Sequence, residues 1–158
     1  MSGNFQIRRA TEEDAETIAR LSGTLGYAAD SGMIRNRLAA LLASDSDLVI
    51  VAALPDKAVV GWLQAHASHV LESGFRVEIT GLIVSPEIRR GSVGRSLVAE
   101  AEKWAAAQSA ETVVVRSNIQ RIESHLFYPA LGYALSKTQT VYRKLLTNRG
   151  HDLDASGA

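Results

Sequence analysis

The sequence predicts a single mixed α/β (α+β) domain, with one central mixed sheet and helices on both of its faces. Three observations support this prediction: strand-like apolar alternation recurs, helix-like periodicity separates the strands, and one strand–helix–strand unit lies in the second half. The expected order is β-α-α-β-β-β-α-β-α-β, and we expect six to seven strands. The domain spans residues 1–146, while the polar, aperiodic residues 147–158 are expected to form a disordered tail.

The first part of the chain should contain one strand and two helices. Residues 5–9 alternate apolar and polar side chains, as a half-buried strand does. Thr11 followed by Asp14 resembles a capping box, with Asp in place of Glu, and opens a helix. A second helix starts at Asp30 or Ser31, because the apolar residues after it repeat at helical spacing.

Three strands should then form an antiparallel meander. The continuous apolar run 48–53 is the first of them, and a turn at 55–57 leads to the second at 58–66. A longer polar connection, 69–75, leads to the third strand at 77–84. The meander should therefore occupy the middle of the sheet.

A strand–helix–strand unit predicts parallel pairing in the second half. A helix begins near Val93, and residues 112–116 form the buried strand that follows it. A crossover of this length joins parallel strands with a right-handed connection. A short helix ended by Pro129 and Gly132 precedes a last alternating strand at 137–144. In a monomer that strand would leave an exposed edge, which predicts a homodimer.

Composition excludes several classes of protein. Seventeen basic and seventeen acidic residues cancel, so we expect neither nucleic-acid nor membrane binding. The absence of cysteine excludes disulfides, thiolate metal sites and a cysteine nucleophile, and we expect no metal. No cationic and apolar leader is visible at Met1–Gln6, and no apolar run approaches the ~20 residues of a membrane span. These features predict a cytoplasmic protein.

The junction at 85–94, between a strand and a helix, is the most informative stretch. Its small residues expose backbone N–H groups at a helix N-terminus, where phosphate binds readily. Arg89, Arg90 and Arg95 add positive charge that can reach a diphosphate. Without further context, the same pattern fits an ordinary turn with solvated arginines.

Two motifs give that context. Residues 89–94, with the pattern Arg-x-x-Ser-x-Gly, resemble the Arg/Gln-x-x-Gly-x-Gly/Ala loop of the GNAT superfamily of acyl-CoA-dependent N-acetyltransferases. Asn118 and residues 125–133 resemble the family's N…FY…LGY/F segment, in the family's order and separation. The resemblance covers residues 5–146 and implies a GNAT-like fold, with a parallel strand pair splayed at the coenzyme site.

The resemblance also implies the donor and the residues that hold it. The loop amides would bind the coenzyme A pyrophosphate, and the preceding strand would pair with the pantetheine arm of acetyl-CoA. Asn118 is equally suited to cap the following helix, and Ser92 replaces a family glycine, so a distorted cradle is expected there first. The implied coenzyme-binding residues are Leu82, Ile83, Val84, Arg89, Arg90, Gly91, Ser92, Val93, Gly94, Arg95, Asn118 and Tyr128.

Acyl transfer from a thioester to an amine needs a base and an acid, because an alkylamine has a pKa near ~10.4. By resemblance, Tyr128 is the acid that protonates the coenzyme A thiolate, although it also fits a core aromatic residue. Glu78 is the first candidate base, since several family members carry a Glu on this strand, and a paired surface carboxylate is its alternative. His66 is the second candidate base and His69, expected in a loop, the third.

The sequence therefore predicts an enzyme that moves an acetyl group from acetyl-CoA to a primary amine of a small molecule or peptide. Direct transfer in a ternary complex is expected, because no cysteine can carry the acyl group. A non-catalytic acyl-CoA-binding sensor or partner module is the alternative. A nucleotide-binding domain is disfavoured, since neither glycine-rich nucleotide loop is present. The acceptor should lie near 25–27 and 66–75, and the sequence does not select it.

Overall fold

The computed structural model describes residues 4–23, 30–88, 92–117 and 122–147. The chain divides into two compact units, residues 1–116 and residues 117–158, which are described separately. The tail predicted at 147–158 lies outside the described residues, apart from Thr147.

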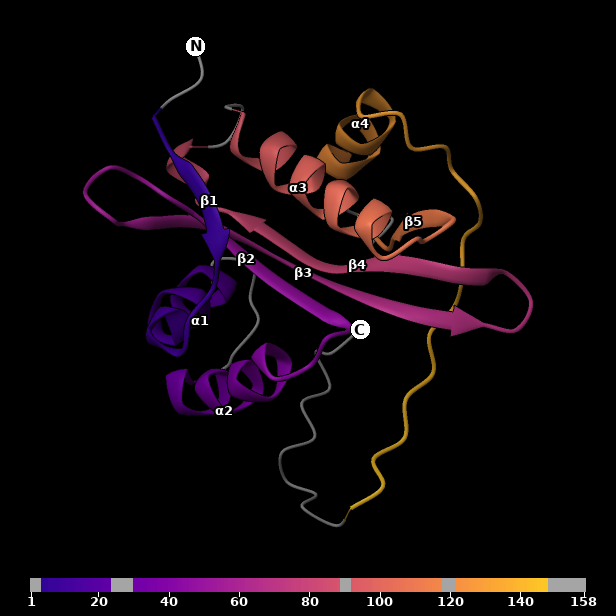
Figure 1. Cartoon of the computed structure of the whole chain (residues 1–158), viewed down its shortest axis with the longest axis horizontal. Coiled ribbons are helices and arrows are strands. Elements are labelled where there is room, and N and C mark those ends of the chain that lie inside the picture. Colours follow the sequence, from indigo (N-terminus) through magenta and orange to yellow (C-terminus); the bar gives the residue numbers. More distant parts are fainter. Residues whose placement is uncertain (1–3, 24–29, 89–91, 118–121, 148–158) are drawn as a thin grey trace. The chain divides into compact units, whose positions relative to one another are not determined.

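The first unit is built on one five-stranded mixed sheet with the order β1-β2-β3-β4-β5 (Figure 1). Its strands are β1 (Gln6–Arg9), β2 (Asp47–Ala53), β3 (Val59–Val70), β4 (Gly74–Val84) and β5 (Thr112–Val115). The first four strands pair antiparallel, and β4 pairs parallel with β5. The predicted meander and the parallel pair are both confirmed.

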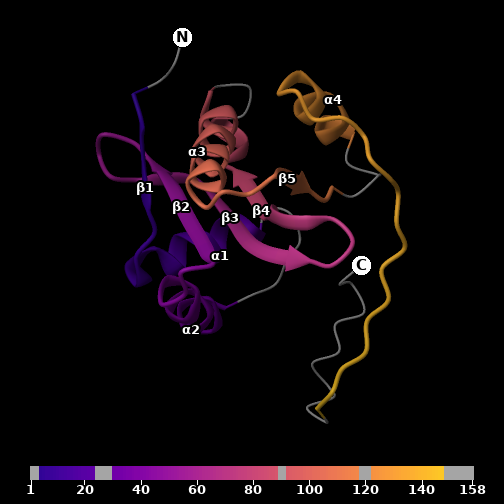
Figure 2. The ribbon, with the colours of Figure 1, turned by 45° about the vertical axis from the view of Figure 1, so that its right-hand side comes forward.

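Helices cover both faces of this sheet, as predicted (Figures 1 and 2). They are η1 (Glu12–Asp14), α1 (Ala15–Gly23), α2 (Ser31–Leu42), η2 (Pro86–Ile88) and α3 (Val93–Ala107). Val49 and Val51 of β2 belong to the core cluster that contains apolar residues of α1 and α2. Leu48 and Ile50 point to the opposite face, where they line a shallow pocket with Trp104 of α3. Strand alternation thus supplies one apolar layer for each set of helices.

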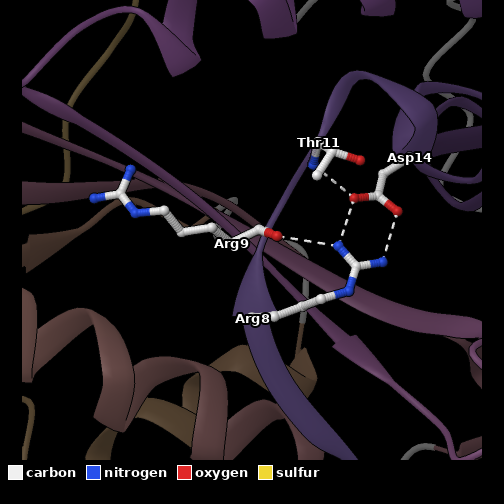
Figure 3. A network of polar contacts seen from close by, with 4 residues as sticks. All are labelled: Arg8, Arg9, Thr11 and Asp14. Carbon is white, nitrogen blue, oxygen red and sulfur yellow. Dashed lines mark hydrogen bonds and ion pairs between the residues drawn. The ribbon is translucent and has the colours of Figure 1, made fainter.

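A network around Asp14 connects β1 to the first helical turn (Figure 3). Arg8 donates from both terminal nitrogens to the two carboxylate oxygens of Asp14, each at 2.9 Å. The Thr11 N–H donates to the same carboxylate at 2.8 Å, which is the acidic half of the predicted capping box. Burial raises the pKa of Asp14, but the hydrogen bonds from Arg8 and Thr11 outweigh it and hold that pKa below its usual value. The edge strand is thereby tied to α1.

The connection between β3 and β4 is shorter than predicted. β3 continues to Val70 and β4 begins at Gly74, so His69 lies in a strand and not in a loop. His69 is opposite Phe75, and the centroids of their rings are 4.4 Å apart. Cross-strand aromatic contacts of this kind stabilise a hairpin. The polar residues near the turn hid this extension, because they interrupt the apolar alternation.

The second unit contains α4 (Ile122–Ala130). Gly132 ends this helix, as predicted, with a φ of +94° that favours glycine. Tyr133 N–H donates to the Tyr128 carbonyl at 3.1 Å, and Gly132 N–H donates to the Pro129 carbonyl at 3.0 Å. This is the Schellman arrangement. Pro129 lies inside α4 and does not end it, because these two bonds close the last turn around the proline.

The strand predicted at Lys137–Lys144 is wrong, and the sheet has five strands where six to seven were expected. Residues 133–146 have no regular secondary structure, and the exposed fractions of Val141 and Tyr142 are 79% and 90%. Alternation defines two faces, but a strand also needs a partner and a buried face to fix its register. The homodimer was predicted from the exposed edge of that strand. It stays a prediction, and the strand no longer supports it.

Candidate active site

The parallel strands β4 and β5 part after four paired residues. Their pairing runs from Arg76 opposite Thr112 to Ile79 opposite Val115. β4 continues for five more residues, to Val84, without pairing to β5, while its other edge stays paired to β3. Since β5 ends at Val115, none of its residues pairs with this part of β4. An extended ligand can add to such an open edge through main-chain hydrogen bonds.

A β-bulge in β4 lies directly after the last residue that pairs with β5. Ala65 of β3 is opposite Ile79, but the next residue, Gln64, is opposite Gly81, so Thr80 is the extra residue. A bulge bends its strand and increases the local twist. The bulge therefore lies directly after the last residue of β4 that pairs with β5.

Gly81, the first residue after the bulge, lies directly against the indole ring of Trp62. A Cβ on Gly81 would lie 2.7 Å from Cζ3 and 2.8 Å from Cη2 of that ring. Real Cβ atoms essentially never approach so closely, so a side chain at position 81 would require the indole or the strand to shift. Trp62 is itself opposite Ile83, one of the predicted pantetheine-binding residues. The indole thus packs along the segment that forms the open edge.

The segment 82–84 lies where the resemblance predicted it, on the open part of β4. Ile83 is buried in the cluster with α1 and α2, while Leu82 and Val84 are half-buried. Their side chains therefore alternate between the two covered faces of the sheet. What this segment can offer to a ligand at the open edge is its backbone.

The N-terminus of α3 is the second part of the site. Ser92 is its N-cap with φ −87°, and its side chain makes no capping hydrogen bond. The buried Ser92 hydroxyl has no hydrogen-bond partner within the described parts of the chain. The amides of Val93, Gly94 and Arg95 occupy the first turn, where helix geometry provides no acceptor. Since φ at Ser92 is negative, the serine Cβ causes no backbone strain here.

These two features suit coenzyme A. Its pantetheine arm carries amides that can pair with an open strand edge, and its pyrophosphate suits uncapped helix amides. The unpartnered Ser92 hydroxyl can donate to a phosphate oxygen, and the exposed Arg95 can add charge. Arg89, Arg90 and Gly91, which were also predicted to bind the coenzyme, lie outside the described residues.

The first two candidate bases, Glu78 and His66, lie in one row that crosses three strands. Asp47 of β2 is opposite His66 of β3, and His66 is opposite Glu78 of β4. Nδ1 of His66 and Oδ1 of Asp47 are 2.8 Å apart. Asp47 is two residues before Val49, so the row lies on the sheet face that α1 and α2 cover. The register thus brings together two of the three predicted catalytic residues.

Glu78 is an ion-paired carboxylate. Its Oε2 lies 2.9 Å from Nε of Arg116, and its Oε1 lies 3.7 Å from Nη2 of Arg76. This is the paired state that the sequence left as the alternative to a base. Asp47 was not among the predicted site residues, and neither arginine was predicted to contact Glu78. Strand register, which a single sequence does not reveal, is what places these side chains together.

Tyr128, the predicted acid, belongs to the second unit. It is half-buried in α4, and its ring makes edge-to-face contacts with Phe127 and Tyr133, at centroid distances of 5.0 and 5.9 Å. Such contacts hold an aromatic ring in one orientation. Asn118, the other predicted site residue of this unit, lies outside the described residues.

Metal ligands and membrane-spanning helices are two further features that bear on function. In the described ranges, no group of three or more His, Cys, Asp or Glu side chains is arranged to hold a metal ion. Of the helices in those ranges, none has the length and apolar character needed to cross a membrane. The site therefore consists of the open strand edge, the helix N-terminus and the polar row.

Several known proteins are similar to this chain in sequence or in fold. An aminoalkylphosphonate N-acetyltransferase from Salmonella typhimurium is 32% identical over 133 residues, which cover 83% of this chain and 86% of that protein. The aminoglycoside N-acetyltransferase AAC(6')-Iy in complex with CoA has the same fold, with a TM-score of 0.80 and 19% identity over 91% of this chain and 97% of that one. A transcriptional regulator from Bacillus halodurans has a TM-score of 0.80 and 22% identity, over 89% of this chain and 100% of that one.

At these identities the two solved structures show a shared fold alone. The family model described as the acetyltransferase (GNAT) family matches residues 12–133, which is most of the chain. Together with the parallel β4–β5 pair and the curated N-acetyltransferase relative, this match leads to one conclusion. The chain belongs to the GNAT family of acetyltransferases.

Proposed function

We propose that this cytoplasmic enzyme transfers the acetyl group of acetyl-CoA to the primary amine of a small molecule. One observation carries the proposal: the pairing of β4 with β5 ends just before the Thr80 bulge. Beyond that point β4, the strand that leads to α3, has a main-chain edge that does not pair with β5. In the proposed complex, the backbone of 82–84 holds the pantetheine arm and residues 89–95 hold the pyrophosphate. Asn118 also contacts the coenzyme.

The amine attacks the thioester directly in this proposal. An acyl-enzyme would need a nucleophile, and the chain has no cysteine. A backbone amide of the open edge of β4 would stabilise the oxyanion, while His66 or Glu78 takes the amine proton. The hydroxyl of Tyr128 would protonate the leaving thiolate, a role that rests on the resemblance of residues 125–133 to the family motif.

The proposed acceptor is a small amine that also carries an acidic group, of the aminoalkylphosphonate type. The name of the Salmonella relative supports this class. The polar row supports it too, because it offers the carboxylates of Asp47 and Glu78 to an ammonium group and the guanidiniums of Arg76 and Arg116 to an anion. Arg is well suited to phosphonate, since its planar fork donates two parallel hydrogen bonds.

Free-thiol release from acetyl-CoA tests the function. The acceptors should include an aminoalkylphosphonate, the carboxylate of equal chain length, the alkylamine without an acidic group, and an aminoglycoside. We expect the phosphonate to give the highest kcat/KM and the plain alkylamine at least ~10-fold less, from the loss of charged hydrogen bonds. Equal rates for both would contradict the acidic-acceptor class.

The same assay separates the enzyme from a sensor module. Coenzyme A binding, measured by calorimetry, without thiol release for any acceptor would contradict the proposed transfer. Intact mass after incubation with acetyl-CoA alone should stay unchanged, because direct transfer leaves no acetyl group on the chain. An acetylated chain that passes its acetyl group to the amine would contradict the ternary mechanism.

A further inference from the structure

We propose that Asp47 is a positioning residue that holds His66 in its Nδ1–H tautomer, and that Nε2 of His66 is the base that takes the amine proton. The inference rests on the proposed acetyl transfer and decides between the two bases it leaves open. It starts from the 2.8 Å contact between Nδ1 of His66 and Oδ1 of Asp47.

The contact has the form of an acid–histidine pair. An ionised carboxylate only accepts hydrogen bonds, so the ring nitrogen that faces it must carry the proton. Nε2 then presents its lone pair, which is what a general base needs. This is the logic by which a buried aspartate orients a catalytic histidine in hydrolases. The carboxylate at position 47 would therefore fix both the ring orientation and the tautomer.

The burial of the two side chains fits these different roles. The Asp47 side chain is 13% exposed, whereas the His66 side chain is 45% exposed. A largely buried carboxylate loses few of its hydrogen bonds to competing water, so it can hold its partner in place. A half-exposed imidazole, by contrast, remains accessible to a small acceptor. No other hydrogen-bond partner of His66 is present in the described ranges.

Glu78 is less suited to be the base. Both of its oxygens face guanidinium groups, Arg116 at 2.9 Å and Arg76 at 3.7 Å. These guanidiniums stand beside both carboxylate oxygens, so they compete with an incoming amine for the same acceptor atoms. Glu78 instead stands opposite His66, where its charge would stabilise the imidazolium that forms in the reaction. The charged groups around His66 are then Asp47 on β2, Glu78 on β4 and the two arginines paired to Glu78.

The row is close to the open edge of β4. Glu78 is two residues before Thr80, where β4 leaves β5, and strands rise ~3.3 Å per residue. His66, opposite Glu78, is therefore within roughly one small-molecule length of the strand segment proposed to hold the pantetheine arm. An amine bound between them can reach both Nε2 and a thioester at the open edge.

The acyl transfer moves one proton to His66 and one proton to the leaving thiolate. The ammonium group of the acceptor gives one proton to Nε2 of His66, and its nitrogen lone pair then forms a bond to the thioester carbon. The carbon–sulfur bond breaks as the tetrahedral intermediate collapses, and the thiolate takes a proton from Tyr128, as proposed above. The nitrogen releases its second proton, which restores the tyrosine through solvent, and His66 returns its proton to water.

The first test determines which tautomer His66 adopts, and it does not require the enzyme to be active. Long-range nitrogen–proton NMR spectra of the whole protein with labelled histidine distinguish an Nδ1–H from an Nε2–H imidazole. At a pH where His66 is neutral, we expect Nδ1–H in the wild-type protein. In Asp47→Asn the amide can donate to Nδ1, so we expect a shift towards Nε2–H. A wild-type Nε2–H tautomer would overturn the proposal.

The second test measures kcat, KM and the pH profile with the best acceptor of the panel. His66→Gln should lower kcat/KM by ~10²-fold, the lower range for general base catalysis, and should remove the acid limb of its pH profile. Asp47→Asn should lower kcat at least ~10-fold, with the KM for acetyl-CoA unchanged, because the wrong tautomer blocks only the proton transfer. Asp45→Asn, which removes the same charge from an exposed turn, should leave kcat unchanged.

The results of the two tests distinguish failure of the proposed function from failure of His66 as the base. If no acceptor yields thiol, the proposed function fails, while the NMR result still decides the Asp47–His66 pair. If the enzyme is active and His66→Gln retains its rate and acid limb, His66 is not the base and the proposal is overturned with the function intact. If Glu78→Gln alone removes the acid limb, the base is Glu78. A drop in Asp45→Asn equal to that in Asp47→Asn would reduce the effect to general charge and contradict positioning.

Discussion

The indole of Trp62 lies so close to Gly81 that it occupies the space of a side chain at position 81. An alanine Cβ there would be 2.7 Å from the ring carbon Cζ3. Because Gly81 directly follows the bulge at Thr80, the contact holds the strand in place where the open edge begins. The conformation of the candidate coenzyme site thus depends on a residue without a side chain.

Gly81→Ala should therefore damage both stability and coenzyme binding. Moving the ring or the strand by several tenths of an ångström costs ~1–3 kcal/mol, as in an overpacked core. We expect a lower free energy of unfolding in urea and at least ~10-fold weaker coenzyme A binding by calorimetry, since 1.4 kcal/mol is about tenfold. Gly23→Ala is the matched control, because a Cβ there meets nothing within 4 Å. Unchanged binding in Gly81→Ala would contradict the proposed role of the edge.

Ser92→Ala tests the helix N-terminus. The Ser92 hydroxyl has no partner in the described residues, so its removal should leave the free energy of unfolding nearly unchanged. If it donates to a coenzyme phosphate, coenzyme A binding should weaken roughly 10-fold, the value of one hydrogen bond to a charged group. Calorimetry with coenzyme A and with pantetheine separates the effects. A variant that binds pantetheine equally well but coenzyme A less well fits the proposal, and equal loss for both ligands would contradict it.

Tyr128→Phe tests the proposed acid. Phenylalanine keeps the ring that contacts Phe127 and Tyr133, so the fold should be retained. Loss of the hydroxyl should lower kcat by ~10²-fold, with little change in coenzyme A affinity, because general acid catalysis acts on the transition state. Tyr142→Phe, at a side chain that is 90% exposed, is the control and should retain full rate. Wild-type kcat in Tyr128→Phe would exclude its hydroxyl as the proton donor.

Asp14→Asn should destabilise the first unit in a pH-dependent way. The Arg8 and Thr11 hydrogen bonds lower the pKa of Asp14 below that of the unfolded chain. The stabilisation is therefore complete above the unfolded value of ~3.9 and is lost as the pH falls through the lower folded pKa. At pH 7 we expect a loss of ~1–3 kcal/mol by urea unfolding.

The difference between wild type and Asp14→Asn should shrink as the pH falls below about 4. Glu13→Gln provides the control, because Glu13 is exposed in the same turn and its change should cost much less. A gap that stays constant from pH 7 to pH 3 would show that the charge of Asp14 contributes nothing.

Local signals in the sequence predicted most of the fold. Residues 93–107 form the helix expected after the glycine loop, and Gly132 ends α4 through a conformation that glycine adopts readily. Alternation at 137–144 predicted a strand that the structure lacks, because alternation does not provide a partner. Strands joined by a turn or by one helix were thus predictable together with their pairing, whereas a strand without such a neighbour was not.

The candidate site divides in the same way. Residues 82–84 and 92–95 follow from a motif of contiguous residues, so a single sequence reveals them. The contact between Asp47 and His66, and the pairing of Glu78 with Arg116, join residues that are far apart in the chain. They depend on the register of four strands. No periodicity in the sequence contains that information.

The open run of β4 also has a thermodynamic consequence. In the described residues, β5 lies beside β4 only as far as Ile79, and a ligand that pairs with residues 80–83 would continue the sheet there. Coenzyme A should then raise the melting temperature and slow amide hydrogen exchange around residues 80–83, while the paired segment before Ile79 changes little. In these terms the coenzyme is a transient structural element of the sheet, present only while the enzyme holds its donor.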